Sequence, residues 1–129
     1  MKVLGPVLAG LGLAIVTIVV AQFLPTDWTL MLLAVILGAS ASVYAGAALA
    51  EQRADNIRLE TTVFVILTVA AVLGLWFSPW FLVGGYVAHG VWDFFHHPHR
   101  IGAKAGPWFP PFCGAYDLIV GLFIVVALR

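Results

Sequence analysis

The sequence predicts an all-α fold, a polytopic membrane bundle in which five transmembrane helices form a single domain over residues 1–129. Composition is the first reason: 63% of the residues are hydrophobic and only 9% are charged, with a mean hydropathy of +1.07, which is typical of membrane proteins. The second reason is that several apolar runs reach the roughly 20 residues needed to cross a bilayer. The third reason is that proline and short polar stretches divide these runs.

The first half of the chain predicts two spans. The first covers Val3–Leu24, between Lys2 and Pro25, and its length fits a retained helix better than a signal peptide. After a short turn, the second span covers Trp28–Ala50, and it begins with an aromatic residue suited to the membrane interface.

Small residues recur every four positions along the second span and form a ridge. The ridge consists of Ala34, Gly38, Ser42, Gly46 and Ala50. In lipid, such a ridge allows another backbone to approach closely, because packing replaces the hydrophobic driving force. We therefore expect it to pack against another helix, and we predict a homodimer through Gly38, Ser42 and Gly46.

The next stretch determines the number of helices. Glu51–Glu60 is strongly polar and is expected to be a loop or surface turn in water, and Thr61–Phe77 is the third span. Ser78 and Pro79 suit an N-cap and the first helical position. One helix running through this point would be about 55 Å long, far beyond a bilayer core of about 30 Å. A fourth span, Pro79–His97, is therefore predicted.

A Pro- and Gly-rich loop at His99–Phe112 leads to the fifth span, Cys113–Leu128. Five spans put nearly all basic residues on one side of the membrane, namely Lys2, Arg53, Arg58, Arg100 and Lys104, and leave only Arg129 on the other. The positive-inside rule then predicts a cytoplasmic N-terminus in a bacterial inner membrane. Four spans, the alternative, divide the basic residues less cleanly.

Polar side chains concentrate in the stretch Gly84–Arg100, which holds all four histidines. On a continuous helix, one face would carry His89, Asp93, His96 and His97, with Trp92 beside it. Charged groups and imidazoles within a membrane helix are costly unless they are paired or coordinated, and they often mark function.

The five-span topology brings further polar groups to the same depth. Glu60 begins the third predicted helix, Asp117 lies in the fifth and Tyr44 in the second. Imidazole and carboxylate ligate transition metals, so a divalent ion, Zn or Fe, is expected. The candidate ligands are Asp93, His96, His97 and Asp117. The candidate acid/base residues are His89 and Glu60. One ion, two ions or a metal-free polar network all remain open.

Other chemistries have weaker support in the sequence. Cys113, near the start of an apolar run, is expected to be inert, and the few serines do not suit a catalytic triad. No phosphate-binding glycine loop predicts a nucleotide. All histidines fall within His89–His99, so a haem held by histidines of two helices is not expected within a monomer. Zero formal net charge gives no reason to expect nucleic acid binding.

The motif H-x3-D-x2-H-H, from His89 to His97, resembles a family of small bacterial integral membrane proteins of unknown function. The resemblance includes the prolines of the following loop, Cys113 and Asp117, and extends upstream to Tyr44, Gly46 and Glu60. It implies that these residues act as a unit. A fainter similarity is to membrane histidine-box oxygenases and desaturases, and it implies a metal centre on the cytoplasmic side.

These observations favour a small metal-dependent enzyme that acts on a lipid or another hydrophobic small molecule at the cytoplasmic membrane boundary. A bound ion would activate water or oxygen there. One alternative is a protein that binds or transports an ion, a proton or a small ligand. Another is an accessory subunit of a larger membrane complex.

Overall fold

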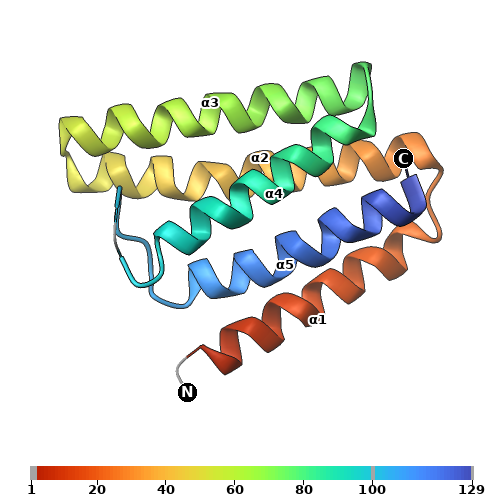
Figure 1. Ribbon diagram of the computed structural model, residues 1–129, viewed down its shortest axis with the longest axis horizontal. Coiled ribbons are helices and arrows are strands. Elements are labelled where there is room, and N and C mark those ends of the chain that lie inside the picture. Colours follow the sequence, from red (N-terminus) through yellow and green to blue (C-terminus); the bar gives the residue numbers. More distant parts are fainter. Residues whose placement is uncertain (1–2, 100, 129) are drawn as a thin grey trace.

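The computed structural model describes residues 3–99 and 101–128 and contains five α-helices joined by short connections (Figure 1). The helices are α1 (Leu4–Ala21), α2 (Thr26–Glu51), α3 (Ala54–Trp76), α4 (Pro79–Phe95) and α5 (Phe109–Phe123). A π-helical turn, Ile124–Leu128, extends α5. The described residues contain no strand, so the predicted all-α fold with five helices is confirmed.

Successive helices run in opposite directions (Figure 1). The α2–α3 turn and the α4–α5 loop lie at one end of the bundle, where α1 begins, and the other two turns lie at the opposite end. Neighbouring helices pack in the order α2, α3, α4, α5, α1, and α2 also contacts α4. We call the end with the α4–α5 loop the loop end. Its placement in the cytoplasm remains a prediction, and Lys2, Arg100 and Arg129 lie outside the described residues.

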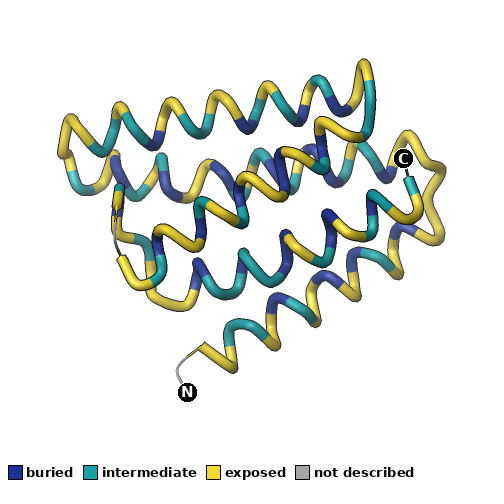
Figure 2. The backbone as a smooth tube through the Cα atoms, in the orientation of Figure 1, coloured by how far each residue is buried: buried dark blue, intermediate teal, exposed yellow. Residues whose placement is uncertain are grey.

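Among the described residues, four segments are long and apolar enough to cross a membrane: α1, α2, α3 and Phe109–Leu128. Helix α4 has 17 residues, or about 25 Å at 1.5 Å per residue, and is shorter than a typical span. Both five spans and four spans fit these lengths. Exposed residues line the outer sides of the helices (Figure 2), and many are large and apolar, such as Ile15, Val35 and Val126. This surface suits contact with lipid.

The helix boundaries differ from the predicted ones. Helix α3 begins at Ala54, so most of the stretch predicted as an aqueous loop is helical, and Asp55 occupies its first turn, where an acid favours the helix dipole. Helix α5 begins at Phe109 rather than Cys113, because prolines in its first turn suit a helix start. Helix α4 ends at Phe95 rather than His97.

Apart from Ala34, which lies in the apolar core, the small-residue ridge of α2 is not buried within the described chain. Of its five members only Ala34 is buried, and Ser42, Gly46 and Ala50 are exposed. A Cβ built on Gly38 or Gly46 would meet no other atom within 4 Å. Close packing of this ridge against another helix of the described chain is therefore absent, and the homodimer remains a prediction.

We expect the substitution Ser42→Leu to dissociate the predicted homodimer into folded monomers. The added volume lies at the centre of the ridge, and overpacking at a close contact costs about 1–3 kcal/mol. Size-exclusion chromatography with light scattering in detergent measures the change. Val35→Leu, at an exposed position of α2, is the control. A Ser42→Leu protein with the wild-type mass and thermal stability would show that the ridge faces lipid.

The apolar core lies on one side of the polar site, away from the loop end. Its largest members come from three helices and include Leu33, Leu37, Leu82, Tyr86 and Val120. The Tyr86 hydroxyl donates a 2.6 Å hydrogen bond to the carbonyl of Leu33. This core fixes α4 against α2 and α5, and so it sets the positions of the polar residues one to two turns nearer the loop end.

Candidate functional site

Two facing helices form a buried polar cluster from two pairs of residues. His89 and Asp93 are four residues apart on α4, and Cys113 and Asp117 are four residues apart on α5. Residues at this spacing share one face of a helix. One potential ligand atom from each residue lies within 4.8 Å of the others, and all four residues are buried. We call these four residues the α4–α5 cluster.

A glycine of each helix lies at the contact between α4 and α5. A Cβ built on Gly90 of α4 would lie 3.7 Å from the Cβ of Asp117, and one built on Gly114 of α5 would lie 3.7 Å from the Cβ of Asp93. Each glycine therefore faces the aspartate of the other helix. A Cβ at either position would make an ordinary van der Waals contact, so the glycines mark this contact without being required for it.

His89 is at the centre of the α4–α5 cluster. Its Nδ1 atom lies 2.5 Å from Asp117 Oδ2, 3.4 Å from Asp93 Oδ2 and 3.8 Å from Cys113 Sγ. The other Asp93 oxygen, Oδ1, accepts a 2.6 Å hydrogen bond from the Tyr44 hydroxyl of α2. A third helix thus fixes the orientation of the Asp93 carboxylate.

Three buried atoms of this cluster have no hydrogen-bond partner among the described residues: His89 Nε2, Asp93 Oδ2 and Asp117 Oδ1. The backbone of Ser40 lies close to the His89 ring. A buried polar atom left unpaired costs about 1–3 kcal/mol. Three such atoms in one cluster therefore point to a site that holds something further.

Glu60 of α3 is the centre of a second buried group. Its Oε1 atom accepts hydrogen bonds from His96 Nε2 at 2.7 Å and from the Ala103 amide at 3.1 Å. Its Oε2 atom accepts from Trp92 Nε1 at 3.0 Å. We call Glu60, Trp92, His96 and Ala103 the Glu60 clamp, because they join α3, the end of α4 and the α4–α5 loop.

The contacts of His96 favour its protonated form. Its Nδ1 atom faces the carbonyl oxygen of Trp92 at 2.8 Å, and its Nε2 atom faces the Glu60 carboxylate. A neutral imidazole has one N–H, so both nitrogens can donate only when the ring is protonated. Burial opposes the charge, but the hydrogen bonds to Glu60 and Trp92 outweigh it and raise the pKa of His96. No ring nitrogen is left for a metal ion.

Tyr44 contacts both groups. Its hydroxyl binds Asp93, and its ring stacks on His96 with 3.9 Å between the ring centroids and 25° between the planes. A tyrosine face over an imidazolium is also a favourable cation–π contact. Tyr44 therefore couples the position of the Glu60 clamp to that of the α4–α5 cluster.

The structure brings most of the predicted site residues together, but in two groups. Residues from helices α2 to α5 all contribute. His89, Asp93 and Asp117 belong to the α4–α5 cluster, whereas Glu60, Trp92 and His96 form the clamp. His97, predicted as a ligand, lies in neither group. It is half-buried and lines a pocket that Asp93 also lines.

The sequence analysis missed two residues. Cys113, expected to be inert, is 2% exposed and lies in the cluster. Ser40 contacts the cluster through its backbone at His89 and its side chain at Cys113. The four-residue spacing from Cys113 to Asp117, which matches that from His89 to Asp93, was the signal that could have found the cysteine.

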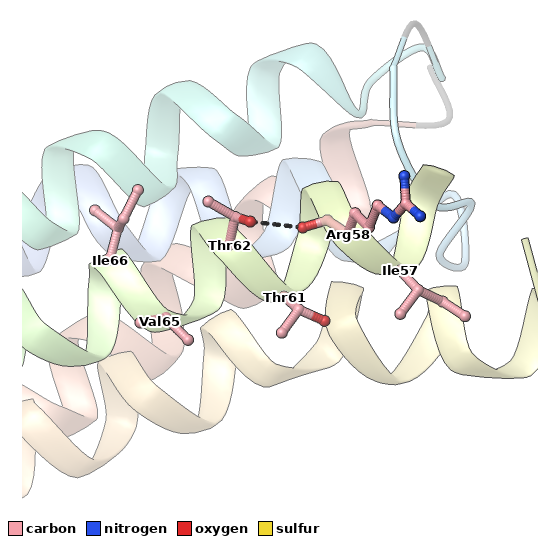
Figure 3. Close-up of a pocket in the computed structure, with 6 residues that line it drawn as sticks. All are labelled: Ile57, Arg58, Thr61, Thr62, Val65 and Ile66. Carbon is pink, nitrogen blue, oxygen red and sulfur yellow. Dashed lines mark hydrogen bonds between the residues drawn. The ribbon is translucent and has the colours of Figure 1, made fainter. Parts of the chain in front are cut away.

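A groove of about 460 Å³ on the outer face of α3 lies apart from both groups (Figure 3). It is lined by Ile57, Arg58, Thr61, Thr62, Val65 and Ile66. The Thr62 hydroxyl donates to the Arg58 carbonyl at 2.7 Å within the helix (Figure 3). No residue of the cluster or of the clamp lines this groove, so it does not belong to the candidate site.

The raised pKa of His96 predicts a pH-dependent stability. Between the ordinary histidine pKa of about 6.5 and the raised value, the folded state binds more protons than the unfolded state. The contribution of His96 is thus complete below about pH 6.5 and is lost as pH rises through the folded pKa. We expect the stability difference between wild type and His96→Gln, measured by denaturant unfolding in detergent, to shrink with rising pH. His99→Gln is the control, and a difference that does not change with pH would contradict the prediction.

No protein-family model, curated protein or solved structure matches this chain. The resemblance to a family of small bacterial membrane proteins and the similarity to histidine-box enzymes therefore remain predictions that rest on the motif residues alone. The candidate site stands on its geometry: a buried His/Asp/Cys cluster between α4 and α5 that could hold a metal ion.

Proposed function

We propose that the protein is a metal-dependent membrane enzyme acting on a lipid or other apolar substrate, with a divalent ion, Zn or Fe, held by the α4–α5 cluster. One observation carries the proposal. Four buried residues of metal-ligating type converge within 4.8 Å of one another, and three of their polar atoms have no hydrogen-bond partner among the described residues.

The chemistry of the donor set supports an ion. Imidazole, thiolate and carboxylate groups are ligands for zinc and for iron. Two ionised aspartates beside a neutral histidine and a neutral thiol would leave two negative charges in an apolar interior, which is very costly. A divalent cation removes that charge. The Tyr44 hydroxyl on Asp93 resembles the outer hydrogen bonds that orient metal ligands.

The roles that we assign to His89 and Glu60 differ from the acid/base roles predicted from the sequence. We assign His89 to ligation, because it lies at the centre of the cluster. We assign Glu60 to holding the loop and His96, because its carboxylate already accepts three hydrogen bonds. A bound ion would act as a Lewis acid or would activate water.

The short contact between His89 Nδ1 and Asp117 Oδ2, 2.5 Å, favours a second candidate, a proton carrier. Protons rather than a metal would then neutralise the cluster, as in intramembrane relays. Proton uptake by proteoliposomes, followed with a pH-sensitive dye, tests this candidate. Uptake that is absent from wild type would exclude it.

Elemental analysis of the purified protein tests the leading proposal. We expect about one transition-metal ion per chain in wild type and in His97→Ala, and a large loss in Asp117→Asn. The asparagine keeps the shape of the side chain but removes its charge, and His97 is a histidine outside the cluster. Wild-type protein without a transition metal, or equal metal in all three proteins, would refute the proposal.

A further inference from the structure

A pocket of about 380 Å³ opens beside the α4–α5 cluster, within the size range of small-molecule sites, roughly 300–1,000 Å³. It lies over α5, which is flanked by α1 on one side and α4 on the other (Figure 1). Val7 of α1, Asp93 and His97 at the end of α4, and Ala115 and Leu118 of α5 contribute to its walls. Leu118 is 61% exposed, so the pocket opens on the side that would face lipid.

The Asp93 carboxylate reaches this pocket because the residues between them are small. Gly90 and Gly114 also line the pocket, and a Cβ built on Gly114 would lie 3.9 Å from Asp93 Oδ2. Asp93 is 1% exposed, and Oδ2 has no hydrogen-bond partner among the described residues. Oδ2 also lies 3.4 Å from His89 Nδ1, so the Asp93 carboxylate borders both the α4–α5 cluster and the pocket, and this identifies the pocket as a binding site next to the cluster.

The polar groups of the pocket lie on the side nearer the loop end of the bundle. His97 is next to the loop, Asp93 is one turn farther into the bundle, and the wall beyond them consists of glycine and apolar residues such as Ala115 and Leu118. A ligand that matches this wall has one polar group at one end of an apolar chain.

We infer that the pocket binds a single apolar chain ending in a hydroxyl group, and that this amphiphile is the substrate; this second part rests on the proposed function. A hydroxyl can donate to Asp93 Oδ2 and accept from an N–H of His97. An ionised carboxylate or phosphate group has no hydrogen to donate to Asp93, so it cannot make this pair of hydrogen bonds. Apolar chains reach the pocket from the bilayer through its open side.

Native mass spectrometry of the purified protein tests the inference with hexadecanol and hexadecanoate as probes. We expect one hexadecanol per chain, and binding of hexadecanoate at least about ten-fold weaker, because an ionised carboxylate has no hydrogen to donate to Asp93. Val7→Trp fills the pocket from α1 and should abolish hexadecanol binding. Leu8→Trp, the adjacent and exposed residue that does not line the pocket, should not.

A second variant covers the case in which Val7→Trp fails to fold. Leu118→Trp lies at the exposed rim, where a larger side chain is tolerated, and it should also reduce hexadecanol binding. Equal binding of the two probes, or hexadecanol binding unchanged in the folded pocket variants, would overturn the inference. Metal content is measured on the same samples. Metal without hexadecanol binding refutes the pocket assignment alone, whereas pocket-dependent hexadecanol binding without metal supports the pocket and refutes the metal-dependent enzyme.

Discussion

Tyr44→Phe is expected to weaken metal binding by about 10- to 100-fold, the usual effect of removing a hydrogen bond to a metal ligand. The substitution deletes only the hydroxyl that binds Asp93 Oδ1 at 2.6 Å. Without it, the carboxylate is free to rotate away from His89 and Asp117. Competition with a chelator of known affinity, in detergent, measures the change.

Tyr86→Phe provides a matched control. Tyr86 is also buried, on α4, and its hydroxyl donates a 2.6 Å bond to the Leu33 carbonyl, away from the α4–α5 cluster. Both variants should lose some stability, because each leaves a buried acceptor with one fewer partner. Only Tyr44→Phe should lose metal affinity. An equal effect of the two variants on metal affinity would show that the Tyr44 hydroxyl does not orient Asp93 for metal binding.

Glu60→Ala is expected to lower the free energy of unfolding by about 3–5 kcal/mol, the range for removing one partner of a buried ion pair. The change leaves the His96 imidazolium, the Trp92 indole N–H and the Ala103 amide without their common acceptor. Denaturant unfolding in mixed micelles gives the measurement. Asp55→Ala, an exposed acid of the same helix, should change stability little.

A double-mutant cycle separates the ion pair from the rest of the clamp. If Glu60 and His96 act together, the double variant Glu60→Ala/His96→Ala should be less destabilised than the sum of the two single variants. Additive losses would show that the two side chains contribute independently, and would contradict the assignment of His96 as a buried cation paired with Glu60.

The helices could be predicted because each depends on local signals. Apolar runs and the Ser78–Pro79 pair define the spans well, and the structure has a helix at each predicted span. The boundaries were less predictable. Residues such as Asp55 and Pro110 look like loop residues by composition, yet they are also favoured in the first turn of a helix, and the structure uses them in that way.

The neighbours within the site could be predicted from residue spacing only where the residues lie inside one continuous helix. His89 and Asp93 lie within α4, so their four-residue spacing correctly placed them on one face. His96 caps α4 and His97 follows it, so neither continues the helical stripe on which the predicted ligand set depended. The earlier start of α5 has the opposite effect, since it puts Cys113 inside a helix, one turn from Asp117.

Cobalt substitution tests the central claim, that the α4–α5 cluster binds a metal ion through Cys113. A thiolate bound to Co²⁺ gives an intense near-ultraviolet charge-transfer band, and a coordinating thiol is deprotonated by the ion. We predict this band for wild type and for His97→Ala, and its loss in Cys113→Ser. A wild-type protein that takes up no cobalt, or a band that survives in Cys113→Ser, would contradict the account.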